Sequence, residues 1–240
     1  MFTKEKINEI KNEFTVYTGY NIPEINSIIY KNTIDFYGEV TRQEILSGNY
    51  TVHLSNSLND CPETFQKAVL FHEFTHIYDL ISNSSLPDNN IEGIMNTYSE
   101  AHAEAIKLRY LLNINLRRKI NQGVRYLVWN TGRKDLGTVT STYLNYSLEH
   151  CNNFQRSKQP KHFKKFIYSY CHFCGYLSIR IDNDVQILLD GILSKFPNQY
   201  HNNLIELYYA IANSDLQKCC VIYAKLKLEA MITTIDIVEP

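Results

Sequence analysis

The stretch Val69-Leu-Phe-His-Glu-Phe-Thr-His-Ile-Tyr-Asp79 decides how the rest of the chain is interpreted. On an α-helix, side chains four residues apart lie one above the other, so a helix here would bring His72 and His76 to a common point. Imidazole nitrogens bind zinc at about 2.0–2.1 Å, and the spacing therefore predicts one ion held by both histidines. Glu73 would lie beside that face and accept a proton from a water on the ion.

The residues around this stretch favour a helix. The segment Asp60-Cys-Pro-Glu63 is typical of a helix start, with Asp60 as the capping residue and Pro62 in the first turn. An apolar stripe follows and predicts an amphipathic helix that ends near residues 82–85. The stripe consists of Phe65, Val69, Leu70, Phe74 and Ile77. The alternative interpretation is a solvated helix face that happens to carry two histidines and a glutamate.

A catalytic zinc site needs a third protein ligand, with the fourth position left to water. The extended signature H-E-x-x-H-x-x-G-x-x-H would place glycine at residue 79 and a histidine ligand at residue 82. The chain has Asp79 and Ser82 there, which excludes this arrangement. The third ligand is therefore expected in another segment.

Residues 96–110 are the best source of this ligand, because their composition is typical of a helix and their small residues allow close packing. Glu100 and Glu104 are one turn apart and share a face. We assign Glu100 as the ligand and Glu104 as the acceptor that orients a ligand histidine through its outer N–H. The exchanged assignment fits the same spacing, and so does a surface run of helix-favouring acids.

Two other residues are weaker candidates for the third ligand. His102 points off the face that the two glutamates share. Asp88 belongs to residues 83–92, which are rich in turn formers and are predicted to be a loop. A loop fixes a ligand less well than a helix does, so neither residue replaces Glu100 in the prediction.

His72-Glu73-x-x-His76, followed after a loop by Glu100-x-x-x-Glu104, resembles the gluzincin zinc metallopeptidases. In that clan a second helix contributes a glutamate ligand, and an acidic residue one turn later steadies a histidine. The gap length, and an alanine three residues after the ligand, are similar to those of the small intracellular ImmA/IrrE-type peptidases of phages and mobile elements. The resemblance covers residues 50–112. It departs from that type at Ile106, where an aromatic residue is usual, and at Asp79, where a glycine or aliphatic residue is usual.

The resemblance implies a hydrolase with an α+β, zincin-like core. The core would combine a short antiparallel sheet, the HExxH helix and the helix of the glutamate ligand, and a mostly helical C-terminal half would follow. The cofactor would be Zn²⁺ and the substrate a protein or peptide. The implied site consists of the ligands His72, His76 and Glu100, the catalytic base Glu73, and the supporting residues Glu104 and Asp79.

Two segments before the HExxH helix are predicted to form strands. In residues 25–40 and 50–55, β-branched and aromatic residues alternate with polar ones, which favours short antiparallel strands. By the resemblance, residues 50–55 would be an edge strand whose open backbone groups bind an extended peptide. We assign His53 on this strand to the surface rather than to the metal. Residues 2–14 are predicted to form an amphipathic helix.

Residues 1–120 are predicted to form the metallopeptidase core, and residues 121–240 a helical region that packs on it and completes the cleft. A loop is predicted at residues 130–137. Helices are predicted at residues 138–151, 161–180, 183–195, 201–213 and 215–231. Donors that stabilise the oxyanion in zinc peptidases are usually Tyr or His, and Tyr143, Tyr146 and His150 are candidates.

Cys171-His-Phe-Cys174, with His150, Cys151 and His162 nearby, is a second constellation of possible zinc ligands. One C-x-x-C without a matching second pair is a weak signal for a structural zinc. Its flanking aromatic residues form a helical apolar stripe. We therefore assign these thiols to the core.

The composition limits the class of partner. The 240 residues include 24 basic and 25 acidic side chains, and this balance gives no electrostatic argument for nucleic acid or a membrane surface. There is no signal-peptide pattern and no apolar run that could span a bilayer. Six cysteines at irregular spacing predict reduced thiols. We expect a cytoplasmic protein, encoded by a bacterium or a phage, whose oligomeric state is left open.

A different class of function fits the same motif. The chain could be a regulatory protein-binding module that keeps a metallopeptidase scaffold and acts by contacting a partner. The presence of Glu73 argues against this interpretation, because a purely structural zinc does not need a base. Hydrolysis of a non-peptide amide is a third interpretation, which the sequence does not separate from proteolysis.

Overall fold

The HExxH motif lies on α3 (Glu63–Ser82), which confirms the predicted helix. Every residue from Ala68 to Ile77 is buried, so the helix is covered on all faces rather than amphipathic. The predicted cap is wrong. Pro62 precedes the helix without a side-chain capping bond, and Asp60 ends the 3-10 helix η1 (Asn56–Asp60).

The computed structural model describes residues 1–32, 37–121 and 125–235, which form two units with alternating segments along the chain. The protein is α+β, mostly helical with little sheet. Unit 1 consists of Met1–Leu86, Ala103–Arg118 and Val124–Leu136, and unit 2 of Pro87–His102, Lys119–Gly123 and Gly137–Pro240. The division falls within α5 (Glu100–Leu111), between His102 and Ala103.

The amphipathic helix predicted at residues 2–14 is confirmed as α1 (Lys4–Thr18), which packs on α3 within unit 1. The contact is aromatic. The fully buried Phe14 ring lies 5.4 Å from the Phe71 ring and 5.6 Å from the Phe74 ring, both in edge-on geometry. Edge-on aromatic pairs contribute beyond their buried area, so these rings hold α1 against the helix of the motif.

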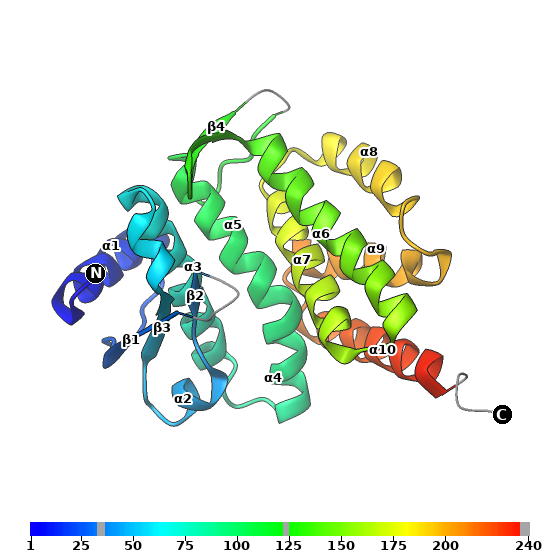
Figure 1. Ribbon diagram of the computed structural model, residues 1–240, viewed down its shortest axis with the longest axis horizontal. Coiled ribbons are helices and arrows are strands. Elements are labelled where there is room, and N and C mark those ends of the chain that lie inside the picture. Colours follow the sequence, from blue (N-terminus) through cyan, green and yellow to red (C-terminus); the bar gives the residue numbers. More distant parts are fainter. Residues whose placement is uncertain (33–36, 122–124, 236–240) are drawn as a thin grey trace. The chain divides into compact units, whose positions relative to one another are not determined.

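The sheet of unit 1 differs from the prediction (Figure 1). Its order is β1 (Ser27–Lys31), β3 (Thr51–Ser55), β2 (Gly38–Glu39), with residues 33–36 outside the described part. β3 pairs in parallel with β1 and antiparallel with β2, so the expectation of a purely antiparallel sheet is wrong. β3 is also the central strand, and its backbone pairs with both neighbours. The expected peptide-binding edge at residues 50–55 is therefore wrong as well.

His53 of β3 is buried rather than on the surface. Its Nε2 lies 2.8 Å from Glu44 Oε2 on α2 (Arg42–Leu46), a short helix that the sequence did not predict. Burial raises the pKa of Glu44, but hydrogen bonds from Thr41 and His53 outweigh it and hold the pKa below its usual value. This pair joins α2 to the sheet.

The predicted loop at residues 130–137 is wrong in part. A hairpin forms there from β4 (Tyr126–Trp129) and β5 (Gly132–Asp135), paired from Tyr126–Asp135 to Trp129–Gly132. β4 contacts α3 within unit 1, and the Trp129 ring lies 5.1 Å from the Phe65 ring. The hairpin thus covers the start of the HExxH helix.

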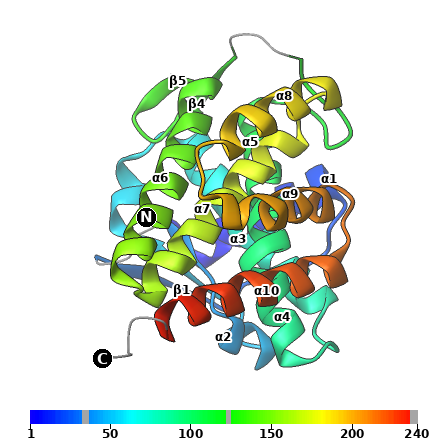
Figure 2. The same cartoon turned by 90° about the vertical axis from the view of Figure 1, so that its right-hand side faces the viewer.

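Unit 2 is helical (Figure 2). In it, α10 (Leu216–Ile235) contacts α4 (Asp88–Ile94) and α9 (Asn198–Ala212), while α7 (Pro160–Ser178) contacts α9 and the π-helix η2 (Met95–Ser99). The predicted C-terminal helices are confirmed within four residues at each end, except that α6 ends at Ser157 rather than at residue 151, whereas the loop predicted at residues 83–92 gives way to α4 at Asp88. The other helices of this half of the chain are α6 (Leu136–Ser157) and α8 (Asp182–Leu193). No helix in the described part of the chain is long and apolar enough to cross a membrane.

Candidate metal centre

The two histidines of the motif converge. His72 Nε2 and His76 Nε2 are 3.1 Å apart, with their rings nearly perpendicular, and both side chains are buried. Two nitrogens bound at about 2.05 Å to one tetrahedral ion would lie about 3.3 Å apart. The pair in unit 1 therefore has the spacing that a shared zinc ion requires.

Glu104 lies at the other nitrogen of His72. Its Oε2 is 3.7 Å from His72 Nδ1 and 2.6 Å from Lys107 Nζ, and the glutamate is fully buried. Because His72 Nε2 faces His76, Nδ1 is the outer nitrogen, where a metal-binding histidine usually meets an acceptor. Lys107 supplies the positive charge that a buried carboxylate needs, and its ammonium group lies 5.0 Å from the Trp129 ring.

Glu73 is buried against the backbone of β2. A Cβ atom added to Gly38 would lie 2.8 Å from Glu73 Oε1 and 2.9 Å from Glu73 Cγ, so only glycine leaves room for this carboxyl group. A Cβ at Gly38 would also meet Val69 Cγ1 at 3.0 Å. The position of the expected base is thus defined by its own helix and by one backbone segment of the sheet.

Asp79, the other expected supporting residue, is buried on α3 three residues after His76. Its backbone carbonyl accepts a hydrogen bond of 2.7 Å from Asn83 Nδ2 near the end of the helix. This contact helps to terminate α3 and places the Asp79 backbone in a structural role.

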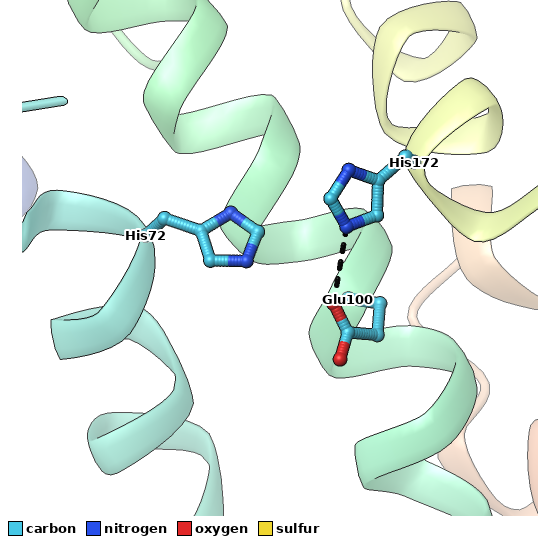
Figure 3. Close-up of side chains that lie close together, drawn as sticks. All are labelled: His72, Glu100 and His172. Atoms are coloured by element: carbon cyan, nitrogen blue, oxygen red, sulfur yellow. Dashed lines mark hydrogen bonds and ion pairs between the residues drawn. The ribbon is translucent and has the colours of Figure 1, made fainter. Parts of the chain in front are cut away.

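Glu100, the expected third ligand, belongs to unit 2 and is the first residue of α5. His172 of α7 holds its carboxyl group: His172 Nε2 lies 3.2 Å from Glu100 Oε2 (Figure 3). Glu104 follows four residues later on the same helix and belongs to unit 1. His102, the weaker candidate, has its ring 5.3 Å from that of Tyr98.

The sequence patterns assign no role to His172. The residue lies inside the Cys171–Cys174 stretch, which they assign to the core, and its separation from Glu100 is 72 residues. One signal is present: His172 is a polar residue among the buried Tyr170 and Phe173 on the apolar stripe of α7. A buried histidine needs a partner, and such a position points to one.

The second set of possible zinc ligands, around Cys171–Cys174, does not form one cluster. His150 Nδ1 and His162 Nδ1 are 3.4 Å apart, while Cys171 and Cys174 are fully buried on α7 and Cys171 Sγ lies 3.8 Å from Asn96 O. Burial raises the pKa of both thiols well above the usual value. Among the described residues these cysteines belong to no group of three ligands close enough to hold an ion, which agrees with a core assignment. All six cysteines are free thiols, as predicted.

Comparisons of the chain with protein-family models, with curated proteins and with solved structures gave no match. The resemblance to gluzincins therefore depends on the residues from His72 to Glu104 themselves.

Proposed function

We propose that the protein is a zinc-dependent peptidase in which His72 and His76 bind the ion. The observation that supports this most directly is the 3.1 Å separation of the two buried Nε2 atoms. A carboxylate on the outer nitrogen of His72, itself neutralised by Lys107 at 2.6 Å, is the further arrangement that metal-binding histidines favour. A pair of histidines that served packing alone would not need this buried charge pair behind it.

Glu100 is the third ligand in this proposal. It precedes Glu104 by four residues on the continuous helix α5, so both carboxyl groups leave the helix on the same side. Glu104 is engaged with Lys107, which leaves the assignment of ligand to Glu100 and of orienting acceptor to Glu104. The exchanged assignment would disturb the ion pair of the fully buried Glu104 with the buried Lys107.

Zinc, when bound, supplies a Lewis acid that polarises the scissile carbonyl and lowers the pKa of a water. Glu73 takes the proton of the attacking water and delivers it to the leaving amine. Its contact with Gly38 restricts the carboxyl group to few positions. We propose a protein or peptide as the substrate. We also propose a cytoplasmic location, because the six free thiols suit a compartment where thiols stay reduced.

The test compares the wild-type protein with Glu73→Gln, which keeps the size of the side chain. Zinc content is measured by elemental analysis, and new protein termini are identified by proteomics after each form is expressed in the same cells. We expect one zinc per chain in both forms and new termini only with the wild type, because loss of a general base lowers rates by about 10²- to 10⁴-fold. Full hydrolysis by Glu73→Gln, or no bound zinc, would contradict the proposal.

The same experiment addresses the regulatory interpretation. A protein-binding module would bind its partner equally well with Gln at residue 73 and would produce no new termini in either form. Repeating the incubation with a chelator separates loss of the ion from loss of the base.

A further inference from the structure

We infer that His172 is the positioning residue for Glu100, fixing the carboxyl group in the orientation in which it binds the ion. This inference rests on the proposed function, because it takes Glu100 to be a zinc ligand. Its structural support comes from unit 2 alone, where His172 Nε2 lies 3.2 Å from Glu100 Oε2 (Figure 3). A carboxylate that binds an ion through one oxygen commonly accepts a hydrogen bond on the other.

The backbone of Glu100 is fixed by what precedes it. Glu100 follows η2, a π-helical turn in which Thr97 and Ser99 are fully buried. This turn contacts α7, α9 and α10 within unit 2. Thr97 Oγ1 also donates a hydrogen bond of 2.6 Å to Gly93 O. Single π-helical turns inside α-helices occur frequently at functional sites, and this one sets the rotation at which α5 begins.

The ring of His172 is fixed on two sides. Tyr168, one turn earlier on α7, has its ring 4.2 Å away, and Tyr143 of α6 has its ring 5.2 Å away in edge-on geometry. The histidine side chain is only 5% exposed. The imidazole therefore has little freedom to rotate, and the hydrogen bond to Glu100 is formed before any ligand arrives.

The donor in the hydrogen bond between His172 and Glu100 follows from the chemistry of the two groups. A carboxylate oxygen only accepts, so His172 donates its Nε2–H to Glu100 Oε2. Loss of this donor would remove a hydrogen bond that orients the carboxylate and compensates one of its oxygens. Groups that orient a metal ligand typically change metal affinity by about 10- to 100-fold.

The test measures the zinc dissociation constant of metal-free protein by competition with a chelator of known affinity. The variants are His172→Phe, which removes the donor, His172→Gln, which keeps an N–H donor, and Glu100→Gln. We expect His172→Phe to weaken zinc binding by about 10- to 100-fold and His172→Gln to recover most of it. In a Glu100→Gln background, His172→Phe should weaken binding no further, because the two residues act as one unit.

His162→Phe is the matched control, because it removes another histidine of α7 whose contact is His150 rather than Glu100. It should leave zinc affinity unchanged. Thermal unfolding of each metal-free variant identifies loss of fold, and if His172→Phe does not fold, His172→Leu, which also lacks a donor, replaces it. Equal zinc affinity in all His172 variants while Glu100→Gln weakens binding would overturn the inference and leave the proposed function standing. Unchanged zinc affinity in Glu100→Gln would overturn both.

Discussion

The carboxyl group of Glu73 and the backbone of Gly38 are in contact, with no space for a side chain at residue 38. A Cβ built there would lie 2.8 Å from Glu73 Oε1, well inside van der Waals distance. The glycine contributes no chemistry of its own. It determines where the proposed base can be, although the two residues are on a strand and a helix far apart in the sequence.

Gly38→Ala is therefore expected to move Glu73 without touching a metal ligand. Displacement of a catalytic group by about 1 Å can lower the rate about 100-fold. We expect hydrolysis of a fluorogenic peptide library to fall by that order while bound zinc stays at the wild-type level. Gly191→Ala is the control, because a Cβ at Gly191 meets nothing within 4 Å. Wild-type activity in Gly38→Ala would show that this contact does not position the base.

Lys107→Met is expected to destabilise the protein by about 3 kcal/mol, because it removes the ammonium 2.6 Å from the fully buried Glu104. Lys67→Met should change stability by less than about 1 kcal/mol, since Lys67 pairs with the more exposed Glu13 and Glu63. Urea unfolding of the metal-free protein measures both. The double variant Lys107→Met/Glu104→Gln should regain part of the loss, and its failure to do so would indicate that lysine packing dominates.

Gly93→Ala is expected to separate α4 from α10. An added Cβ would lie 2.9 Å from Cys220 Cα, a backbone atom that cannot rotate away. Overpacking of this kind destabilises a protein by about 1–3 kcal/mol. This cost exceeds the stability gained because alanine favours a helix more than glycine does. Thermal unfolding should show a lower midpoint. Cys220→Ala in the same chain should not restore it, and full restoration would place the conflict at the thiol instead.

Tyr17→Phe is expected to change how stability depends on pH. Tyr17 donates a hydrogen bond of 2.5 Å to Ile114 O, and burial raises its pKa from 10.0 to about 12. Near neutral pH the variant should lose about 1 kcal/mol. Between pH 10 and 12 the unfolded tyrosine releases its proton while the folded one retains it, so the wild type loses stability relative to the variant. Urea unfolding at several pH values measures this difference, and a constant difference would contradict the assignment.

The helices were predictable because their signals are local. The apolar spacing around His72 and His76 is enough to predict α3, and the same reasoning predicts the helices of the C-terminal half within a few residues. The prediction for α3 is wrong about the exposure of the helix. Periodicity predicts an exposed face, but hydrophobic residues and the buried motif leave none between Ala68 and Ile77.

The sheet could not be predicted in the same way, because strand direction and order depend on contacts between distant segments. Nothing in residues 50–55 indicates that β1 pairs with them in parallel. Two short elements were missed for another reason. α2 has only five residues, and β5 consists of Gly132-Arg-Lys-Asp135, residue types that disfavour strands.

The residues of the candidate site likewise fall into those that local sequence spacing predicts and those that only the fold reveals. Its local part, His72, Glu73 and His76, follows from one helical turn, and the spacing of Glu100 and Glu104 follows from another. The HExxH and Glu100–Glu104 motifs include neither His172 nor Gly38, since each of these residues reaches its partner only through the fold. Sequence spacing predicted which residues could act, whereas the structure identifies the residues that hold them in place.

The interleaving of the two units has a consequence for biosynthesis. The segment Pro87–His102 leaves the ribosome before α7, α9 and α10, the helices against which η2 packs. Unit 1 likewise receives its last segment, which ends at Leu136, only after that part of unit 2 has been made. Neither unit can therefore complete its folding until a later segment of the chain has been translated. The first helices of the nascent chain lack some of their packing partners until then.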